Sequence, residues 1–143
     1  MSSTIVVTGA GQGLGYCIAS EHLENGDFVY GYDCNLSDDL LRLAEKNKNL
    51  NIAQCDIGST SSVSEAVQSL LENGKPVDIL YNVAGIYRFE DKVGLCETEL
   101  DQCTDMFNVN AVGALRMCKA ILPLLREGSL IINISSEAGS ITV

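Results

Sequence analysis

Residues 5–15 read IVVTGAGQGLG, a short apolar run followed at once by a glycine-rich turn. The apolar run predicts a buried strand, and the apolar positions behind the turn (Leu14, Ile18 and Leu23) predict a helix that begins there. Glycine permits positive φ angles and a close approach of another backbone, and the first turn of a helix has unpaired N–H groups that suit a phosphate. The stretch therefore predicts the pyrophosphate cradle of a dinucleotide site.

The composition favours one globular domain over residues 1–143. Hydrophobic residues make up 46% of the chain, and a domain of this length buries about 70% of its unfolded surface. The net charge of −10 argues against nucleic acid or an anionic membrane as a partner. No signal peptide or membrane span is recognisable in the sequence. Six cysteines without a Cys-x-x-Cys pair, beside a single His, predict reduced thiols in a cytoplasmic protein and no metal site.

Strand and helix patterns alternate along the chain. Strands are predicted at 4–8, 28–32, 51–55, 77–81 and 130–134, and helices from the glycine-rich turn to Asn25-Gly26 and at 36–46, 59–71, 97–107 and 110–126. Ser37 or Asn35 is expected to cap the second helix, and Pro123 to bend the last one. The alternation predicts an α/β fold, a Rossmann-type doubly wound parallel sheet of strand order 3-2-1-4-5 with helices on both faces.

The glycines of the opening turn are not spaced as Gly-x-Gly-x-x-Gly. They form Thr-Gly-x-x-x-Gly-x-Gly instead, with Gly9, Gly13 and Gly15. The position of the turn between a strand and a helix supports a bound dinucleotide, whereas a turn without a ligand is the alternative.

Asp33 closes the second predicted strand, 24 residues beyond Gly9. A carboxylate at this place accepts hydrogen bonds from both hydroxyls of an adenosine ribose and repels a 2′-phosphate. Neither Gln12 in the turn nor Cys34 after the strand supplies a cation for that phosphate. These residues predict NAD as the cofactor in preference to NADP, although a solvated strand end at Asp33 is the alternative.

Several further motifs make the whole chain resemble the classical short-chain dehydrogenase/reductase family. Thr8–Gly15 resembles the family's cofactor loop, and Asp56-Ile57 resembles the pair whose carboxylate meets the adenine amino group. Residues 82–85, Asn-Val-Ala-Gly, resemble the family's Asn-Asn-Ala-Gly, with Val83 in place of the second Asn. The cofactor-binding residues implied by the resemblance are Gly9, Gln12, Gly13, Leu14, Gly15, Asp33, Asp56, Ile57, Asn82, Ala84 and Gly85.

Two positions match catalytic residues of the family. Asn110, in Phe-Asn-Val-Asn-Ala-Val-Gly, falls on the asparagine that bends its helix and holds a water of the proton relay. Ser136, in Ile-Asn-Ile-Ser-Ser, falls on the serine that hydrogen-bonds the substrate oxygen. The resemblance implies hydride transfer between the nicotinamide ring and a small alcohol or carbonyl substrate. Residues 135–141 further resemble the carbonyl-reductase-like branch related to the C-factor proteins.

The family's Tyr-x-x-x-Lys pair and its last strands do not follow Ser136 in this sequence. We therefore expect an N-terminal fragment of a longer protein that binds cofactor but catalyses poorly, since general acid–base help accelerates reactions by about 10² to 10⁴. The apolar strand at 130–134 is expected to be an exposed edge prone to association, and the complete form is expected to be a homo-oligomer. The alternative is a non-catalytic nucleotide-binding or interaction module.

Overall fold

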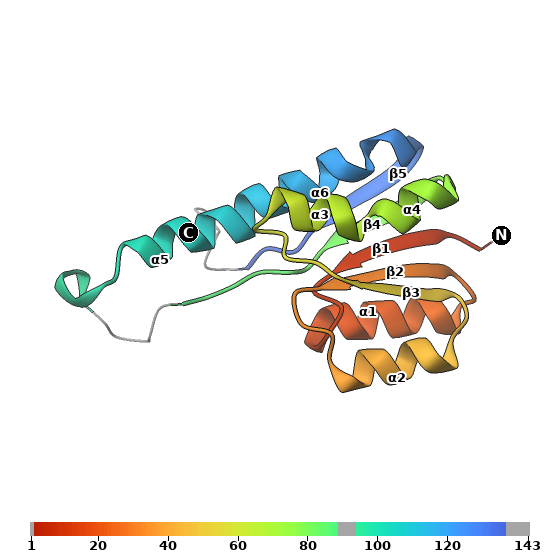
Figure 1. Cartoon of the computed structure of the whole chain (residues 1–143), viewed down its shortest axis with the longest axis horizontal. Coiled ribbons are helices and arrows are strands. Elements are labelled where there is room, and N and C mark those ends of the chain that lie inside the picture. Colours follow the sequence, from red (N-terminus) through yellow and green to blue (C-terminus); the bar gives the residue numbers. More distant parts are fainter. Residues whose placement is uncertain (1, 89–93, 137–143) are drawn as a thin grey trace.

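The computed structural model describes residues 2–88 and 94–136, in which strands and helices alternate as predicted (Figure 1). The elements are β1 (Thr4–Thr8), α1 (Gly13–Glu24), β2 (Phe28–Asp33), α2 (Asp38–Lys46), β3 (Leu50–Gln54), α3 (Thr60–Ala66), α4 (Gln68–Asn73), β4 (Val77–Asn82), the 3₁₀ turn η1 (Leu95–Glu97), α5 (Asp101–Phe107), the π-helical turn η2 (Asn108–Gly113), α6 (Ala114–Ile121), the 3₁₀ turn η3 (Leu122–Leu124) and β5 (Leu125–Asn133).

The described strands form one parallel sheet in the order β3-β2-β1-β4-β5, which confirms the predicted topology. β1 lies in the middle, where Val6 is in register with Tyr30 of β2 and with Leu80 of β4. Every residue of β1 is buried, as expected of a strand covered on both faces. All these strands run in one direction, so their carboxyl ends meet at a single edge of the sheet.

Helices cover both faces of the sheet (Figure 1). α1 and α2 lie on one face, over a core of Ile5, Val7, Ala10, Ala19, Val29, Leu40 and Leu50. α3, α4 and α6 lie on the other face, over a larger core that includes Val6, Tyr32, Val63, Leu70, Leu80, Met117 and Ile121. Adjacent residues of β1 thus contribute to opposite cores, as the alternation of side chains along a strand requires.

Several helix ends lie where the turn and cap residues predict them. Ser37 caps α2, because its Oγ accepts a hydrogen bond from the N–H of Leu40 at 3.2 Å. After α1 the chain turns at Gly26 (φ +83°), and α4 ends at Gly74 (φ +65°). Both glycines occupy the left-handed region in which a side chain is strained.

Three helices differ from the prediction. The helix predicted at 97–107 begins as α5 at Asp101 and continues directly into η2. The helix predicted at 59–71 is divided at Val67 into α3 and α4, although hydrogen bonds continue through it from Val67 N–H to Val63 and from Leu71 N–H to Val67. The helix predicted at 110–126 ends as an α-helix at Ile121. Pro123 explains this earlier end, because proline has no N–H for the helical hydrogen bond and its ring clashes with the preceding turn.

β5 begins earlier than predicted, at Leu125, and is irregular near its start. Leu125 is in register with Val77 and Leu130 with Ile79, so β5 bulges between these pairs. Gly128 adopts φ +91° in this bulge, and Ser129 fastens it by donating a hydrogen bond from Oγ to the carbonyl oxygen of Val77 at 2.7 Å. The extra residues form an irregular segment that a period-two pattern does not reveal.

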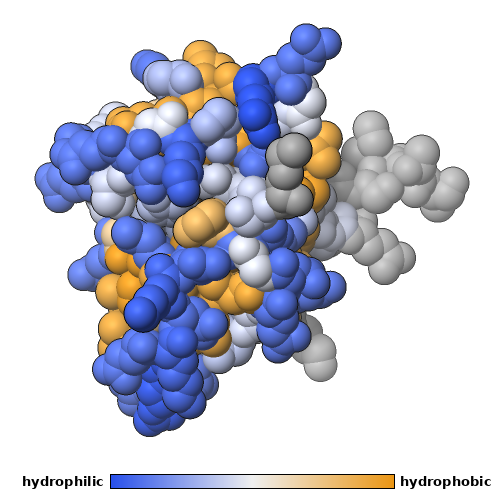
Figure 2. Space-filling view, turned by 90° about the vertical axis from the view of Figure 1, so that its right-hand side faces the viewer, coloured by the Kyte–Doolittle hydropathy of each residue, from blue (hydrophilic) through white to orange (hydrophobic). Residues whose placement is uncertain are grey.

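Two carboxylates fasten the amino end of the sheet, which faces the viewer in Figure 2 among predominantly hydrophilic residues. The first belongs to Asp27, which follows α1. Its pKa is lowered chiefly because His22 Nδ1 donates to the carboxylate at 2.8 Å, and also because the N–H of Ser3 donates to it.

The second carboxylate belongs to Asp78 of β4. Its pKa is lowered chiefly by the N–H of Thr4, which donates to it at 2.8 Å, and further by the guanidinium of Arg126. The pKa values of Asp27 and Asp78 therefore both lie below the ordinary carboxyl value in the folded protein.

We predict an acid-dependent loss of stability from this arrangement. A carboxyl whose pKa is lowered by folding stabilises the protein above its unfolded pKa, and this stability is lost as the pH falls through the lower folded value. The free energy of unfolding, measured by urea denaturation, should therefore decrease below about pH 4. Asp27→Asn and Asp78→Asn should each lower the stability at neutral pH and flatten this acid dependence. An unchanged acid dependence in both variants would contradict the assignment.

Candidate cofactor and active site

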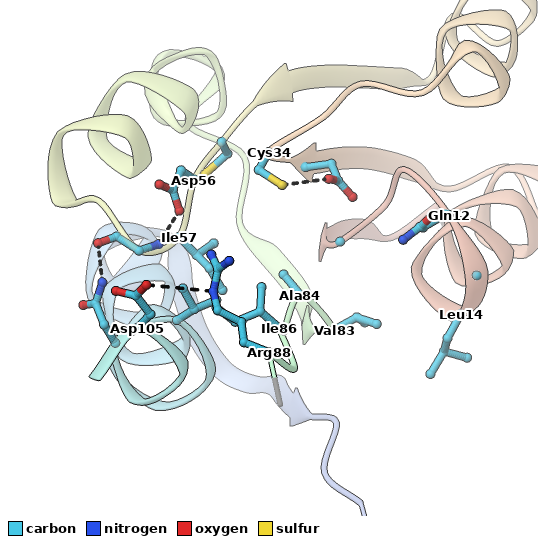
Figure 3. A pocket seen from close by; sticks show the side chains of 18 residues that line it. Gln12, Leu14, Cys34, Asp56, Ile57, Val83, Ala84, Ile86, Arg88 and Asp105 are labelled. Atoms are coloured by element: carbon cyan, nitrogen blue, oxygen red, sulfur yellow. Dashed lines mark hydrogen bonds and ion pairs between the residues drawn. The ribbon is translucent and has the colours of Figure 1, made fainter. Parts of the chain in front are cut away.

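A cleft of about 710 Å³ lies at the carboxyl ends of β1 to β4 (Figure 3). It is bounded by the loops that follow these strands and by the junction of α5 and η2. The residues that line it are Gly9, Gln12, Gly13, Leu14, Asp33, Cys34, Cys55, Asp56, Ile57, Gly58, Val83, Ala84, Gly85, Ile86, Arg88, Asp105, Asn108 and Val109. This edge is where ligands bind in open α/β sheets, at the point where the strand order reverses.

The glycine-rich turn forms one wall of the cleft, and three of its positions require glycine because of a positive φ angle, a close backbone contact or both. Gly9 has φ +71°, and a Cβ on it would lie 2.9 Å from the backbone N of Ala84. Gly15 is buried beneath the turn, where a Cβ would lie 2.1 Å from the carbonyl oxygen of Gly9. Gly13 has φ +53°, lines the cleft, and would meet no atom within 4 Å. Gly9 and Gly15 therefore allow close packing, whereas Gly13 leaves space at the start of α1.

The carboxylate of Asp33 is held at the cleft by backbone N–H groups. Its Oδ2 accepts a hydrogen bond from Gly11 at 2.8 Å, and its Oδ1 accepts one from Asn35 at 3.0 Å. A Cβ on Gly11 would lie 2.8 Å from Oδ2, so the close approach of the carboxylate requires glycine at this position. Asp33 is recognisable in the sequence, but this role of Gly11 is not, because the contact joins residues that are 22 positions apart.

Asp56 and Ile57 form the wall opposite the glycine-rich turn (Figure 3). Oδ1 of Asp56 accepts a hydrogen bond from the N–H of Gly58 at 2.8 Å, which fixes the turn after β3. Ile57 is buried against Gly113 of η2, where a Cβ would lie 2.8 Å from Ile57 Cδ1. The Asp56-Ile57 pair therefore depends on close packing against the π-helical turn.

Two thiols also line the cleft without adding charge at neutral pH. Burial raises the pKa of Cys34, and the neighbouring carboxylate of Asp33 raises it further. Burial and the nearby Asp56 raise the pKa of Cys55 to about 11. Both thiols consequently remain protonated, and the negative charge of the described wall belongs to its carboxylates.

Thr8 ties the end of β1 to the loop after β4. Its Oγ1 accepts hydrogen bonds from the N–H groups of Val83 and Ala84, both at 3.1 Å. The sequence alone does not reveal these contacts of Thr8, since its partners lie 75 and 76 positions away. This hydroxyl fixes the backbone that separates the cleft from the cavity beside it.

Asn82 has a different environment from the other predicted cofactor residues. Its side chain is buried and donates from Nδ2 to Oδ1 of Asn133 at 2.9 Å, across the β4–β5 pair. It does not line the cleft but a smaller cavity that lies next to the cleft. Its contacts therefore join the two strands behind the predicted active site.

A second cavity of about 570 Å³ adjoins the cleft, and the two share Val83, Ala84, Gly85 and Ile86 in their linings. Ser135 and Ser136 reach this cavity from the end of β5, and Asn110 reaches it from η2. The structure thus brings both predicted catalytic residues, Asn110 and Ser136, to one cavity next to the cleft.

The amide of Asn110 is paired with the backbone of Ile86. Oδ1 accepts the Ile86 N–H at 2.7 Å, and Nδ2 donates to the Ile86 carbonyl oxygen at 2.8 Å. Asn110 belongs to the π-helical turn η2, a local widening of a helix that is frequent at functional sites. Its side chain therefore fixes the backbone strip that the two cavities share.

Arg88, which follows the Asn-Val-Ala-Gly motif after β4, lines the cleft as well. Its Nε lies 3.9 Å from Oδ2 of Asp105. Figure 3 shows this pair on the side of the cleft away from Gln12. The position of Arg88 directly after the loop of β4 is the signal that it borders the site.

The described residues include no group of three or more His, Cys, Asp or Glu side chains that could hold a metal ion. Within the same part of the chain, no helix is both long and apolar enough to cross a membrane.

A family model described as short chain dehydrogenase matches residues 3–143. The chain belongs to the short-chain dehydrogenase family. Among curated relatives, it is 34% identical over 140 residues to the short-chain dehydrogenase/reductase olcF of Penicillium canescens, with 94% of this chain and 52% of the relative covered. It is 32% identical over 145 residues to the 2-(R)-hydroxypropyl-CoM dehydrogenase of Xanthobacter autotrophicus, with 96% and 58% covered. The chain thus spans a little over half the length of these relatives.

Solved structures of short-chain dehydrogenases and reductases have the same fold. An NADPH-bound carbonyl reductase from chicken fatty liver superposes with a TM-score of 0.85 at 27% identity, over 98% of this chain and 59% of that chain. An NADP-bound short-chain dehydrogenase/reductase from Burkholderia multivorans has a TM-score of 0.83 at 29% identity, over 99% and 62%. These similarities agree with the fold class derived from the strand and helix pattern.

Proposed function

We propose that this short-chain dehydrogenase is an NAD-dependent oxidoreductase that transfers hydride between nicotinamide and a small alcohol or carbonyl substrate. The observation that carries the proposal is the strip of backbone from Val83 to Ile86, which borders both the cleft and the cavity of Asn110 and Ser136. A dinucleotide in the cleft would place one of its ends against this shared strip. Its reactive ring would then meet a substrate in the second cavity.

The residues of the cleft fit such a cofactor. The open space at Gly13 and the amides at the start of α1 suit the pyrophosphate, together with Gly9, Gln12, Leu14 and Gly15. Asp33 would accept the adenosine ribose hydroxyls, and Asp56 with Ile57 would contact the adenine. Ala84 and Gly85 would contact the nicotinamide half, and Asn82 would support them from behind. The bound nicotinamide would supply or take up the hydride.

Two residues of the second cavity have proposed chemical roles. The exposed hydroxyl of Ser136 would hydrogen-bond the substrate oxygen and orient its carbon for hydride transfer. Asn110 would act through the π-helical turn, where its amide holds Ile86 and where a water of the proton relay would bind.

We further propose a preference for NAD over NADP. Asp33 supports it, because a carboxylate held by Gly11 and Asn35 at the end of β2 would repel a 2′-phosphate. Arg88 is a cation of the cleft, but it lies beside Asp105 on the wall formed by α5 and η2. This chain would thus differ in cofactor from the NADPH-bound and NADP-bound relatives named above.

Asp33→Asn tests this preference. The variant keeps the size of the side chain and removes its charge, so the ratio of the NADPH and NADH dissociation constants should fall by at least about tenfold. Both constants are measured by fluorescence titration of the reduced cofactors. Cys34→Ser is the control, because it changes the neighbouring side chain without changing a charge, and it should leave the ratio within about twofold. Equal affinities of the wild-type protein for NADH and NADPH would contradict the proposal.

The complete protein is proposed to be cytoplasmic and homo-oligomeric, without nucleic acid or membrane partners. Two large apolar side chains, Phe107 on α5 and Leu115 on α6, are each 67% exposed and support an interface with another copy. The acidic net charge supports the absence of nucleic acid partners.

Catalysis is tested by following NADH oxidation with a panel of small aldehydes and ketones. The enzyme proposal predicts that at least one carbonyl compound is reduced at the expense of NADH. The alternative, a nucleotide-binding or interaction module, predicts NADH binding without consumption by any of them. A wild-type protein that fails to bind NADH would contradict both.

A further inference from the structure

We infer that Arg116 is a positioning residue. It holds the wall of the cleft formed by Asp56 and Ile57, which is proposed to contact the adenine, against the π-helical turn that carries Asn110. The inference rests on the proposed dinucleotide site and adds to it a residue that the predicted site does not contain. Arg116 lies on α6 and is half-buried. It points back along the helix toward η2, and its guanidinium joins segments that are nearly 60 residues apart in the sequence.

The guanidinium makes four hydrogen bonds to three partners. Nε donates to Oγ1 of Thr60 at 3.1 Å. One terminal nitrogen donates to the carbonyl oxygens of Ile57 at 3.0 Å and of Asn108 at 3.1 Å. The other donates to Oδ1 of Asn108 at 2.6 Å. Arg116 therefore holds the turn after β3, the start of α3 and the first residue of η2 at the same time.

Asn108 completes the clamp from the side of the π-helical turn. Its Nδ2 donates to the carbonyl oxygen of Gly58 at 2.9 Å, so its amide links Arg116 to the residue that follows Ile57. A Cβ on Gly58 would lie 3.2 Å from this Nδ2, which shows how closely the two segments approach. The clamp acts directly on the wall made by Asp56 and Ile57.

The same clamp fixes the turn from which Asn110 reaches Ile86. Asn108 and Asn110 belong to η2, and Arg116 fixes both the backbone and the side chain of Asn108. One guanidinium thus connects the wall formed by Asp56 and Ile57 with the turn whose Asn110 holds Ile86. Arginine suits this task because its planar fork presents several donors in fixed directions, whereas lysine has a single ammonium group.

Arg116→Met and Arg116→Lys test the clamp, since both keep a long aliphatic stem. The measured quantities are the dissociation constants of ADP-ribose, which carries the adenine half, and of reduced nicotinamide mononucleotide. We expect Arg116→Met to weaken ADP-ribose binding at least tenfold. The mononucleotide should change less than threefold, because Asn110 still holds Ile86 through its own two hydrogen bonds. Arg116→Lys should fail to restore ADP-ribose binding. Arg126→Met is the matched control, because it removes an arginine that pairs with Asp78 at the other end of the sheet, and both constants should remain as in the wild type.

A merely structural role would give a different result. Global destabilisation lowers the folded fraction and weakens both ligands equally, so the ratio of the two constants would stay constant. An unchanged ratio in Arg116→Met, or full restoration by Arg116→Lys, would overturn the inference. If Arg116→Met does not fold, Asn108→Ala serves in its place, with the same expected change in ratio and the same contradicting result. A wild-type protein that binds neither NADH nor ADP-ribose would instead contradict the proposed function.

Discussion

Replacement of Gly15 by alanine should destabilise the protein by at least about 3 kcal/mol and abolish measurable NADH binding. A Cβ at this position would lie 2.1 Å from the carbonyl oxygen of Gly9 and 2.7 Å from its carbonyl carbon. Both contacts are with backbone, so no side-chain rotation relieves them. The start of α1 must move away from the turn, and the amides proposed to bind the pyrophosphate move with it. Urea denaturation and NADH titration measure the two effects.

Two other glycines separate steric overlap from backbone strain. Gly26 has φ +83° and would meet no atom within 4 Å, so Gly26→Ala should destabilise the protein by about 1 to 2 kcal/mol and leave NADH binding intact. Gly13→Ala has the same kind of strain but lies in the cleft, and it should weaken NADH binding as well. A Gly15→Ala protein as stable as Gly26→Ala would show that the turn tolerates the additional Cβ.

Ser136→Ala should reduce turnover by about 10² or more while the affinity for NADH changes less than twofold. The hydroxyl is proposed to contact the substrate oxygen in the second cavity, whereas the dinucleotide is held from the larger cleft. Steady-state rates of carbonyl reduction measure the turnover, and NADH titration measures the affinity for the cofactor.

Ser135→Ala is the matched control for this prediction. Ser135 lines the same cavity and precedes Ser136 directly, but the family resemblance falls on Ser136. The rate should therefore remain within about fivefold of the wild-type value in Ser135→Ala. Loss of turnover in Ser135→Ala together with full turnover in Ser136→Ala would transfer the role to Ser135.

The sequence was sufficient to predict the topology because the relevant signals are local. Apolar runs, Ser37 before a helix and Gly26 behind one each act within a few residues. The strand order then follows from the right-handed connections of a parallel sheet. Pro123 was also visible, but its effect was underestimated, since it ends α6 rather than bending a longer helix.

The contacts that shape the candidate site were not visible in the same way. Gly11 holds Asp33, Thr8 holds the loop after β4, and Arg116 holds the turn after β3 through hydrogen bonds across 22 to 76 positions of sequence. The family resemblance implies a bend at Asn110, but the apolar pattern does not reveal the π-helical turn, because a single widened turn does not alter the apolar period over a window of helix. Sequence motifs were therefore enough to predict the ligand contacts. The residues that position those contacts could be recognised only in the folded structure.

A crystal structure of the protein with NADH tests the central claim most directly. We predict the adenosine ribose on Asp33, the adenine beside Asp56 and Ile57, the pyrophosphate at Gly13, and the nicotinamide ring next to the cavity of Ser136. A dinucleotide bound in the reverse direction, or away from the carboxyl ends of β1 to β4, would contradict the account.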